Sequence, residues 1–167
     1  MTLKLFQIKL IQLYKEQELQ LVDLYEKLAQ AFPAHAGTFQ MLANEEREHA
    51  GWIGHLETSI ENGTASFSEG KTRTYTLTTF IAYVKKIIAS LERGEMELPK
   101  ALALVVDIEK SFIERQVFER FDGDSDEVGR ILKILDETQH GHLNRIEQFA
   151  RQARVEGSSA AKTGDAA

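Results

Sequence analysis

Apolar residues recur at helical spacing through most of the chain, and this pattern predicts an all-α protein. Four long amphipathic helices are expected, at residues 3–32, 38–61, 98–121 and 126–154. Pro33 falls between the first two helices, and Pro99 falls in the first turn of the third, where proline is tolerated. Because the connection between the first two helices is short, we expect them to be antiparallel neighbours.

The connection between the second and third helices is long enough to cross a bundle from one end to the other. Residues 62–73 are rich in Gly, Ser and Thr and predict a loop, whereas apolar spacing predicts a short extra helix at residues 77–92. The expected domain is therefore an antiparallel four-helix bundle over residues 1–154, with a long crossover that carries one short helix. Residues 155–167 are small and polar and are expected to form a disordered tail.

Two polar residues lie inside the apolar face of the second predicted helix. Glu46 and His49 are three residues apart, so both side chains project from one side of the helix. They share this side with four apolar residues, Phe39, Leu42, Ile53 and Leu56, whereas Glu45, Arg47 and Glu48 are expected to point away. A Glu-x-x-His pair is ordinarily a solvated helix surface, but a buried carboxylate is costly unless it is protonated, paired or bound to a cation. The pair therefore predicts a metal site.

Single glutamates also interrupt the apolar faces of the first and third helices. Glu18 lies in the middle of the first face, and Glu109 lies in the middle of the third. Tyr25 is one to two turns from Glu18 on the same face. It is a candidate to hold a metal ligand through a hydrogen bond; a core tyrosine with a satisfied hydroxyl is the alternative.

The fourth predicted helix contains a second Glu-x-x-His, from Glu137 to His140, but its apolar ladder passes through other residues. The ladder consists of Val128, Leu132, Leu135, Ile146 and Phe149. Gln139 and His142 lie on this ladder, whereas Glu137 is about 160° from Gln139 around the helix. We therefore expect Gln139 and His142 to face inward, and Glu137 and His140 to face solvent. Asp136 is roughly 60° from the inward line and is a further candidate to reach the site.

The second and fourth helices repeat one another. Glu46 corresponds to Gln139 and His49 to His142, each with an offset of 93 residues. Glu18 and Glu109 are offset by 91 residues. This internal repeat predicts two helical hairpins related by pseudo-symmetry.

Composition excludes several classes of site and partner. The chain has no cysteine, so disulfides, iron–sulfur clusters and thiol catalysis are excluded, and a metal must be held by His, carboxylates or amides. A net charge of -6 with dispersed Lys and Arg argues against a nucleic-acid surface. The longest apolar run, residues 101–106, is too short to span a bilayer, and no signal-peptide pattern is present. We expect a cytoplasmic protein with no membrane contact.

Together these residues resemble the rubrerythrin-like branch of the ferritin-like superfamily of di-iron carboxylate proteins. The resemblance rests on Asn44-Glu45-Glu46-Arg47-Glu48-His49-Ala50, on the Glu18 to Tyr25 spacing and on the four inward positions, and it covers about residues 16–149. It implies that Glu18 and His49 serve one metal, that Glu109 and His142 serve the other, and that Glu46 bridges them. The family's other bridging carboxylate falls on Gln139, an amide, so the second ion is expected to bind more weakly.

The resemblance implies an oxidoreductase in which two irons reduce peroxide or activate oxygen. The rubredoxin module of rubrerythrin needs cysteines, so electrons are expected from an external donor. Relatives commonly pair their bundles, which implies a homodimer. Because of Gln139, one alternative is a metal-binding bundle without turnover, in which zinc, manganese or a single iron occupies a redox-silent or partly filled site. The other is a bundle that has lost metal and acts through dimerisation.

Overall fold

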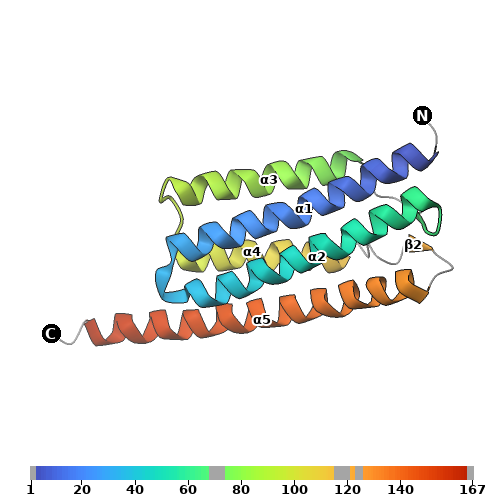
Figure 1. Ribbon diagram of the computed structural model, residues 1–167. Coiled ribbons are helices and arrows are strands. Elements are labelled where there is room, and N and C mark those ends of the chain that lie inside the picture. Colours follow the sequence, from blue (N-terminus) through green and yellow to red (C-terminus); the bar gives the residue numbers. More distant parts are fainter. Residues whose placement is uncertain (1–2, 68–73, 115–120, 123–125, 165–167) are drawn as a thin grey trace.

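The computed structural model describes residues 3–67, 74–114, 121–122 and 126–164, and within them the chain is almost entirely helical. The bundle consists of α1 (Leu3–Ala31), α2 (Ala36–Asn62), α4 (Leu98–Glu114) and α5 (Asp126–Gly164), which run side by side (Figure 1). Two short strands, β1 (Ser66–Phe67) and β2 (Phe121–Asp122), pair antiparallel at one end. The predicted all-α class is confirmed, and the arrangement is consistent with a ferritin-like helical bundle.

The helix boundaries follow local chemistry. A short 3-10 turn, η1 (Pro33–His35), separates α1 from α2, because proline cannot continue the hydrogen bonding of α1. At the other end of α2, Gly63 adopts a left-handed φ of 79° and its N–H donates to the Ile60 carbonyl. Glycine reaches this conformation without the strain that a Cβ would add, so it ends the helix.

The last helix is longer than the sequence predicted. We expected it to end near residue 154, but α5 continues to Gly164, and residues 165–167 of the expected tail lie outside the described residues. No proline interrupts residues 155–164, and alanines there favour a helix. Gly157 costs about 1 kcal/mol relative to alanine, which does not by itself end a helix. The predicted end of the third helix, at about residue 121, falls partly outside the described residues, since 115–120 are not described.

Between α2 and α4, the helix α3 (Thr74–Glu92) packs against α1 (Figure 1). Its buried residues recur every three or four positions: Leu77, Phe80, Ile81, Val84, Ile87, Ile88 and Leu91. On its outer face, Lys85 Nζ lies 3.4 Å from Glu16 Oε1 of α1. The helix is therefore amphipathic.

Among the described residues, no helix is both long and apolar enough to cross a membrane.

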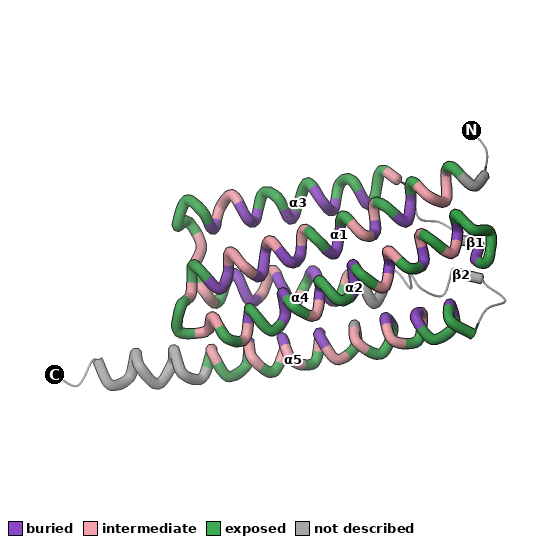
Figure 2. The backbone as a smooth tube through the Cα atoms, in the orientation of Figure 1, coloured by how far each residue is buried: buried purple, intermediate pink, exposed green. Residues whose placement is uncertain are grey.

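The buried positions of the helices point into the bundle (Figure 2). The apolar core is not continuous, because its residues form two separate clusters. One apolar cluster contains Leu21 of α1, Ala43 of α2 and Ile146 of α5. The other contains Tyr14 of α1 and, from α2 and α5, Ile53 and Leu135. On each of these helices, the residues between the two clusters include a buried polar side chain. A polar layer therefore divides the core.

Candidate metal centre

Five buried ionisable side chains from four helices occupy the layer between the two apolar clusters. Each exposes only 1–3 % of its surface. They are Glu18 on α1, Glu46 and His49 on α2, Glu109 on α4 and His142 on α5. All five were expected to face inward because each replaces an apolar residue in a helical ladder, and the structure brings them together.

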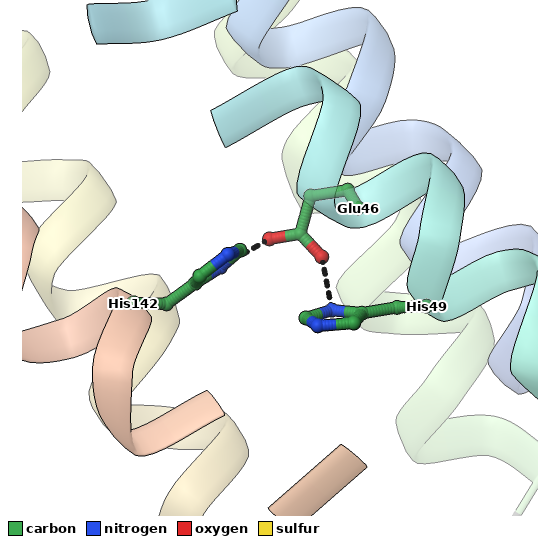
Figure 3. Close-up of side chains that lie close together, drawn as sticks. All are labelled: Glu46, His49 and His142. Carbon is green, nitrogen blue, oxygen red and sulfur yellow. Dashed lines mark hydrogen bonds and ion pairs between the residues drawn. The ribbon is translucent and has the colours of Figure 1, made fainter. Parts of the chain in front are cut away.

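Glu46 lies between the two imidazoles (Figure 3). Its Oε2 is 2.9 Å from His49 Nδ1, and its Oε1 is 3.0 Å from His142 Nδ1. The two imidazole rings are 5.0 Å apart between centroids. One ligand atom from each of the three residues lies within 4.8 Å of the others, a grouping that could hold a metal ion. One oxygen of Glu46 therefore faces the histidine of the α1–α2 half of the bundle, and the other faces the histidine of the α4–α5 half.

The other two carboxylates flank this group. Glu18 Oε2 is 3.7 Å from His49 Nδ1. Glu109 Oε1 accepts a hydrogen bond of 2.6 Å from the hydroxyl of Tyr25, a side chain that is completely buried. The Tyr25 hydroxyl is therefore satisfied within the core, and its partner is a site carboxylate on α4 rather than the nearby Glu18 on its own helix.

Burial and the contacts among these five residues shift the pKa values of the whole group. Burial raises the pKa of Glu18 to about 8 and that of Glu109 to about 7, and the charge of Glu46 adds to both effects. Burial alone would also raise the pKa of Glu46, but hydrogen bonds with His142 and His49 outweigh it and hold that pKa below its usual range. Against the opposing effect of burial, hydrogen bonds with Glu18 and Glu46 raise the pKa of His49 to about 10. The pKa of His142 is raised mainly by Glu46, also against burial.

This donor set fits a metal. In the absence of a cation, the raised pKa of His49 keeps its imidazole protonated beside the ionised Glu46 near neutral pH, while Glu18, with a pKa of about 8, carries a proton. A divalent cation can replace these protons, because imidazole nitrogens and carboxylates bind metals in their deprotonated forms. Carboxylates and imidazoles together suit iron, manganese and zinc.

Some buried polar atoms in the same layer lack a hydrogen-bond partner within the described part of the chain. These atoms include Nε2 of both His49 and His142 and both side-chain polar atoms of Gln17, the residue before Glu18. Buried polar groups are normally satisfied by protein, water or an ion. Sequence reasoning missed Gln17, because a single glutamine next to Glu18 is not on the ladder that identified the site.

On α5 the structure separates the inward histidine from the Glu-x-x-His motif. His142 is buried, whereas the side chains of His140 and Glu137 are 57 % and 64 % exposed, as predicted. The structure does not bring Asp136, the further candidate, to the site: its side chain is 66 % exposed and lies 3.9 Å from His140 Nδ1. Asp136 sits at the edge of the buried face, where water can solvate its charge. The backbone of Gln139 is part of α5, but its side chain lies outside the described residues.

Glu45 is the residue that sequence reasoning placed wrongly. We expected it to point away from the site, but its carboxylate contacts both His142 Nε2 and the Arg145 guanidinium across the α2–α5 interface. Glu45 is about 100° from Glu46 around α2, and its long side chain reaches the neighbouring helix. A signal was present in the sequence, since Arg145 is three residues after His142 on the same side of α5 and has the opposite charge to Glu45.

Comparison with known proteins supports one family. The family model for rubrerythrin matches residues 15–127, more than half of the chain. The matched region contains Glu18, Glu46, His49 and Glu109, and it ends before His142. No curated protein and no solved structure matches the chain significantly.

Proposed function

Since the chain belongs to the rubrerythrin family, we propose that it is a di-metal oxidoreductase whose iron centre reduces peroxide or oxygen. The observation that carries this proposal is the placement of Glu46, whose two oxygens each contact the imidazole of a different half of the bundle. A carboxylate so placed suits a ligand shared by two cations.

The ligands divide between the two halves. Glu18 and His49 would hold one metal, Glu109 and His142 the other, and Glu46 both. Bound iron supplies one-electron redox chemistry and Lewis acidity toward a peroxide oxygen. The apolar clusters on either side of the polar layer keep bulk water away from it. Tyr25 orients Glu109 by donating its hydroxyl hydrogen to Oε1.

Turnover needs reducing equivalents from outside this chain. Reduction of one peroxide to two waters consumes two electrons and two protons, and the chain has no cysteine with which to build an iron–sulfur electron relay. We therefore include a separate electron-donor protein among the partners, together with peroxide or oxygen as oxidant and a second copy of the chain. The proposed location is the cytoplasm.

A second candidate function is metal binding without turnover. The described site contains three carboxylates, and the internal repeat places the amide of Gln139 where a fourth would stand. Three carboxylates leave a residual positive charge around two divalent ions in a buried site, which weakens the second ion. A single iron, a zinc or a manganese would then neutralise the buried carboxylates and stabilise the bundle.

Metal analysis combined with a peroxide reaction distinguishes the two candidates. The full chain is purified without added metal, its metal content is measured, and the ferrous form is mixed anaerobically with peroxide. The proposed enzyme holds about two irons per chain and is oxidised by peroxide faster than free ferrous iron under the same conditions. One zinc or manganese per chain, with no peroxide-dependent oxidation after loading with iron, would support the binding function instead.

A further inference from the structure

The two imidazoles of the site differ in what faces their second nitrogen. Each directs Nδ1 toward Glu46. Neither Nε2 has an aligned hydrogen bond within the described part of the chain, but His142 Nε2 faces the Glu45 carboxylate in an ion pair, whereas the ion pairs of His49 are made through Nδ1. The half of the bundle that contains Gln139 therefore has an extra carboxylate behind its histidine.

Arg145 holds this carboxylate in place. Its Nη2 contacts the same Oε2 of Glu45 that faces His142. The guanidinium folds back along α5 over Gly141, where Nη1 lies 3.4 Å from the position a Cβ would occupy. The side chains of Arg145 and Glu45 are 41 % and 30 % exposed, and that of His142 is 1 % exposed. A chain of contacts thus runs from the surface at Arg145 through Glu45 and His142 to Glu46.

A histidine that binds a metal with one nitrogen carries its proton on the other, and the acceptor of that proton sets the tautomer and the direction of the ring. Nδ1 of His142 faces the shared Glu46, so Nε2 is the nitrogen that must carry the proton. Nε2 has no aligned hydrogen bond within the described part of the chain, and Glu45 Oε2 is the charged atom that faces it. Glu45 Oε2 is therefore placed to accept a hydrogen bond from the N–H at His142 Nε2.

We propose that Glu45, held by Arg145, is a positioning residue that fixes His142 with Nδ1 toward the metal centre. Its negative charge also supplements the half of the site in which Gln139 stands in place of a carboxylate. This inference rests on the proposed metal function. It makes the metal position of His142 depend on two residues, Glu45 and Arg145, that bind no metal themselves.

Cobalt(II) titration of the metal-free full chain tests the dependence, with the visible absorption of bound cobalt as the readout. The position that belongs to His142 is identified as the one lost in His142→Ala. We expect Glu45→Ala to weaken cobalt binding at that position by about 10–100-fold and to leave the other position unchanged. Arg145→Ala should act in the same direction but less strongly, because Glu45 remains. The matched control is Glu48→Ala, which removes an exposed glutamate from the same helix.

The tautomer of His142 separates positioning from a general loss of structure. Nitrogen NMR of the zinc-loaded chain should report a proton on Nε2 of His142 in the parent. Glu45→Gln retains an acceptor oxygen without the charge, so it should keep this tautomer while binding cobalt with intermediate affinity. In Glu45→Ala we expect the His142 signals to show mixed ring states, while those of His49 stay unchanged.

The outcomes distinguish this inference from the proposed function. If Glu45→Ala and Arg145→Ala bind cobalt like the parent with an unchanged His142 tautomer, the positioning role is overturned and the metal function stands. If the parent binds cobalt but His142→Ala has no effect, the positioning role is overturned together with the assignment of His142 as a ligand. A folded parent that binds no cobalt overturns both. Should Glu45→Ala fail to fold, Glu45→Gln and Arg145→Ala decide between these outcomes.

Discussion

The two helical hairpins of the bundle, α1–α2 and α4–α5, contribute to one buried layer in different ways. The first hairpin supplies Glu18, Glu46 and His49, all of them ionisable. The second supplies Glu109 and His142, and the residue that corresponds to Glu46 is the amide Gln139. Two residues of the first hairpin contact side chains of the second: Tyr25 donates a hydrogen bond to Glu109, and Glu45 contacts His142. A repeat of sequence pattern therefore does not imply two equivalent metal positions.

The largest expected effect comes from the residue that both hairpins share. Glu46→Ala removes the carboxylate that contacts both imidazoles, and we expect metal affinity at both positions to fall by more than about 100-fold. Thermal stability should then lose its dependence on added metal. Metal content after dialysis and thermal melts with and without metal measure the change, with Glu48→Ala as the control for loss of a glutamate from α2. Parent-like metal binding by Glu46→Ala would contradict the assignment of the site.

Restoring the missing carboxylate should reduce the difference between the hairpins. Gln139→Glu adds a negative charge at nearly constant volume, so it should raise the affinity of the weaker position more than that of the stronger one. If the metal is iron, oxidation by peroxide should also become faster. Metal per chain and the rate of peroxide-driven oxidation are compared between parent and variant. Unchanged values in a folded variant would mean that residue 139 does not face the site.

The pH dependence of stability should reverse its sign when metal binds. Burial raises the pKa of Glu18 from 4.5 to about 8, so between these values the folded metal-free chain binds more protons than the unfolded chain. Its free energy of unfolding therefore falls as pH rises across this interval, and Glu109, with a pKa raised to about 7, contributes in the same direction. Metal binding releases these protons, so metal affinity rises with pH.

Thermal melts of the metal-free and metal-loaded chain from about pH 5 to about pH 8 test this reversal. The difference between the two melting temperatures should widen steadily with rising pH. Glu46 does not oppose the trend in this range, because its lowered pKa affects stability only below its ordinary value of 4.5. A metal-free chain that becomes more stable with rising pH would contradict the buried, protonated state of Glu18 and Glu109.

A smaller effect is expected at the hydrogen bond that links the hairpins. Tyr25→Phe keeps the buried ring but removes the donor to Glu109, which should cost about 1–3 kcal/mol in the metal-free chain. In a domain of this size, the melting temperature should fall by about 2–4 °C per kcal/mol. Tyr83→Phe is the matched control, because it removes the same atom from a tyrosine that is 43 % exposed. Equal melting temperatures for the two variants would mean that the Tyr25 hydroxyl contributes nothing.

The smallest effect is expected on the outer side of α5. His140→Ala and Glu137→Ala change exposed residues and should leave metal content unchanged and stability within about 0.5 kcal/mol. His142→Ala, by contrast, should lower the metal content. The opposite result, with loss of metal in His140→Ala alone, would mean that α5 is rotated relative to the described structure.

Periodicity of apolar residues was sufficient to predict the helices and the inward direction of the five buried ionisable side chains, although not that of Gln17. It also separated His142 from His140, because burial on one face of a helix leaves a strong pattern in the sequence. Contacts between side chains of different helices leave a weaker pattern in the sequence. The approach of Glu45 to His142 depends on the packing of α5 against α2 and on the conformation of a long side chain, and neither follows from the spacing of residues within one helix. Nor does an angular offset tell whether water can reach a short carboxylate, and the structure leaves Asp136 exposed to solvent.

An anaerobic titration of the metal-free chain with ferrous iron is the most direct test of the central claim, that one buried layer holds two unequal metal positions around Glu46. Equilibrium dialysis measures bound iron per chain as the free iron concentration rises. We predict two binding steps, with the weaker step strengthened in Gln139→Glu and both steps lost in Glu46→Ala. Binding in two equal steps would contradict the inequality of the hairpins, and iron binding that persists in Glu46→Ala would contradict the site itself.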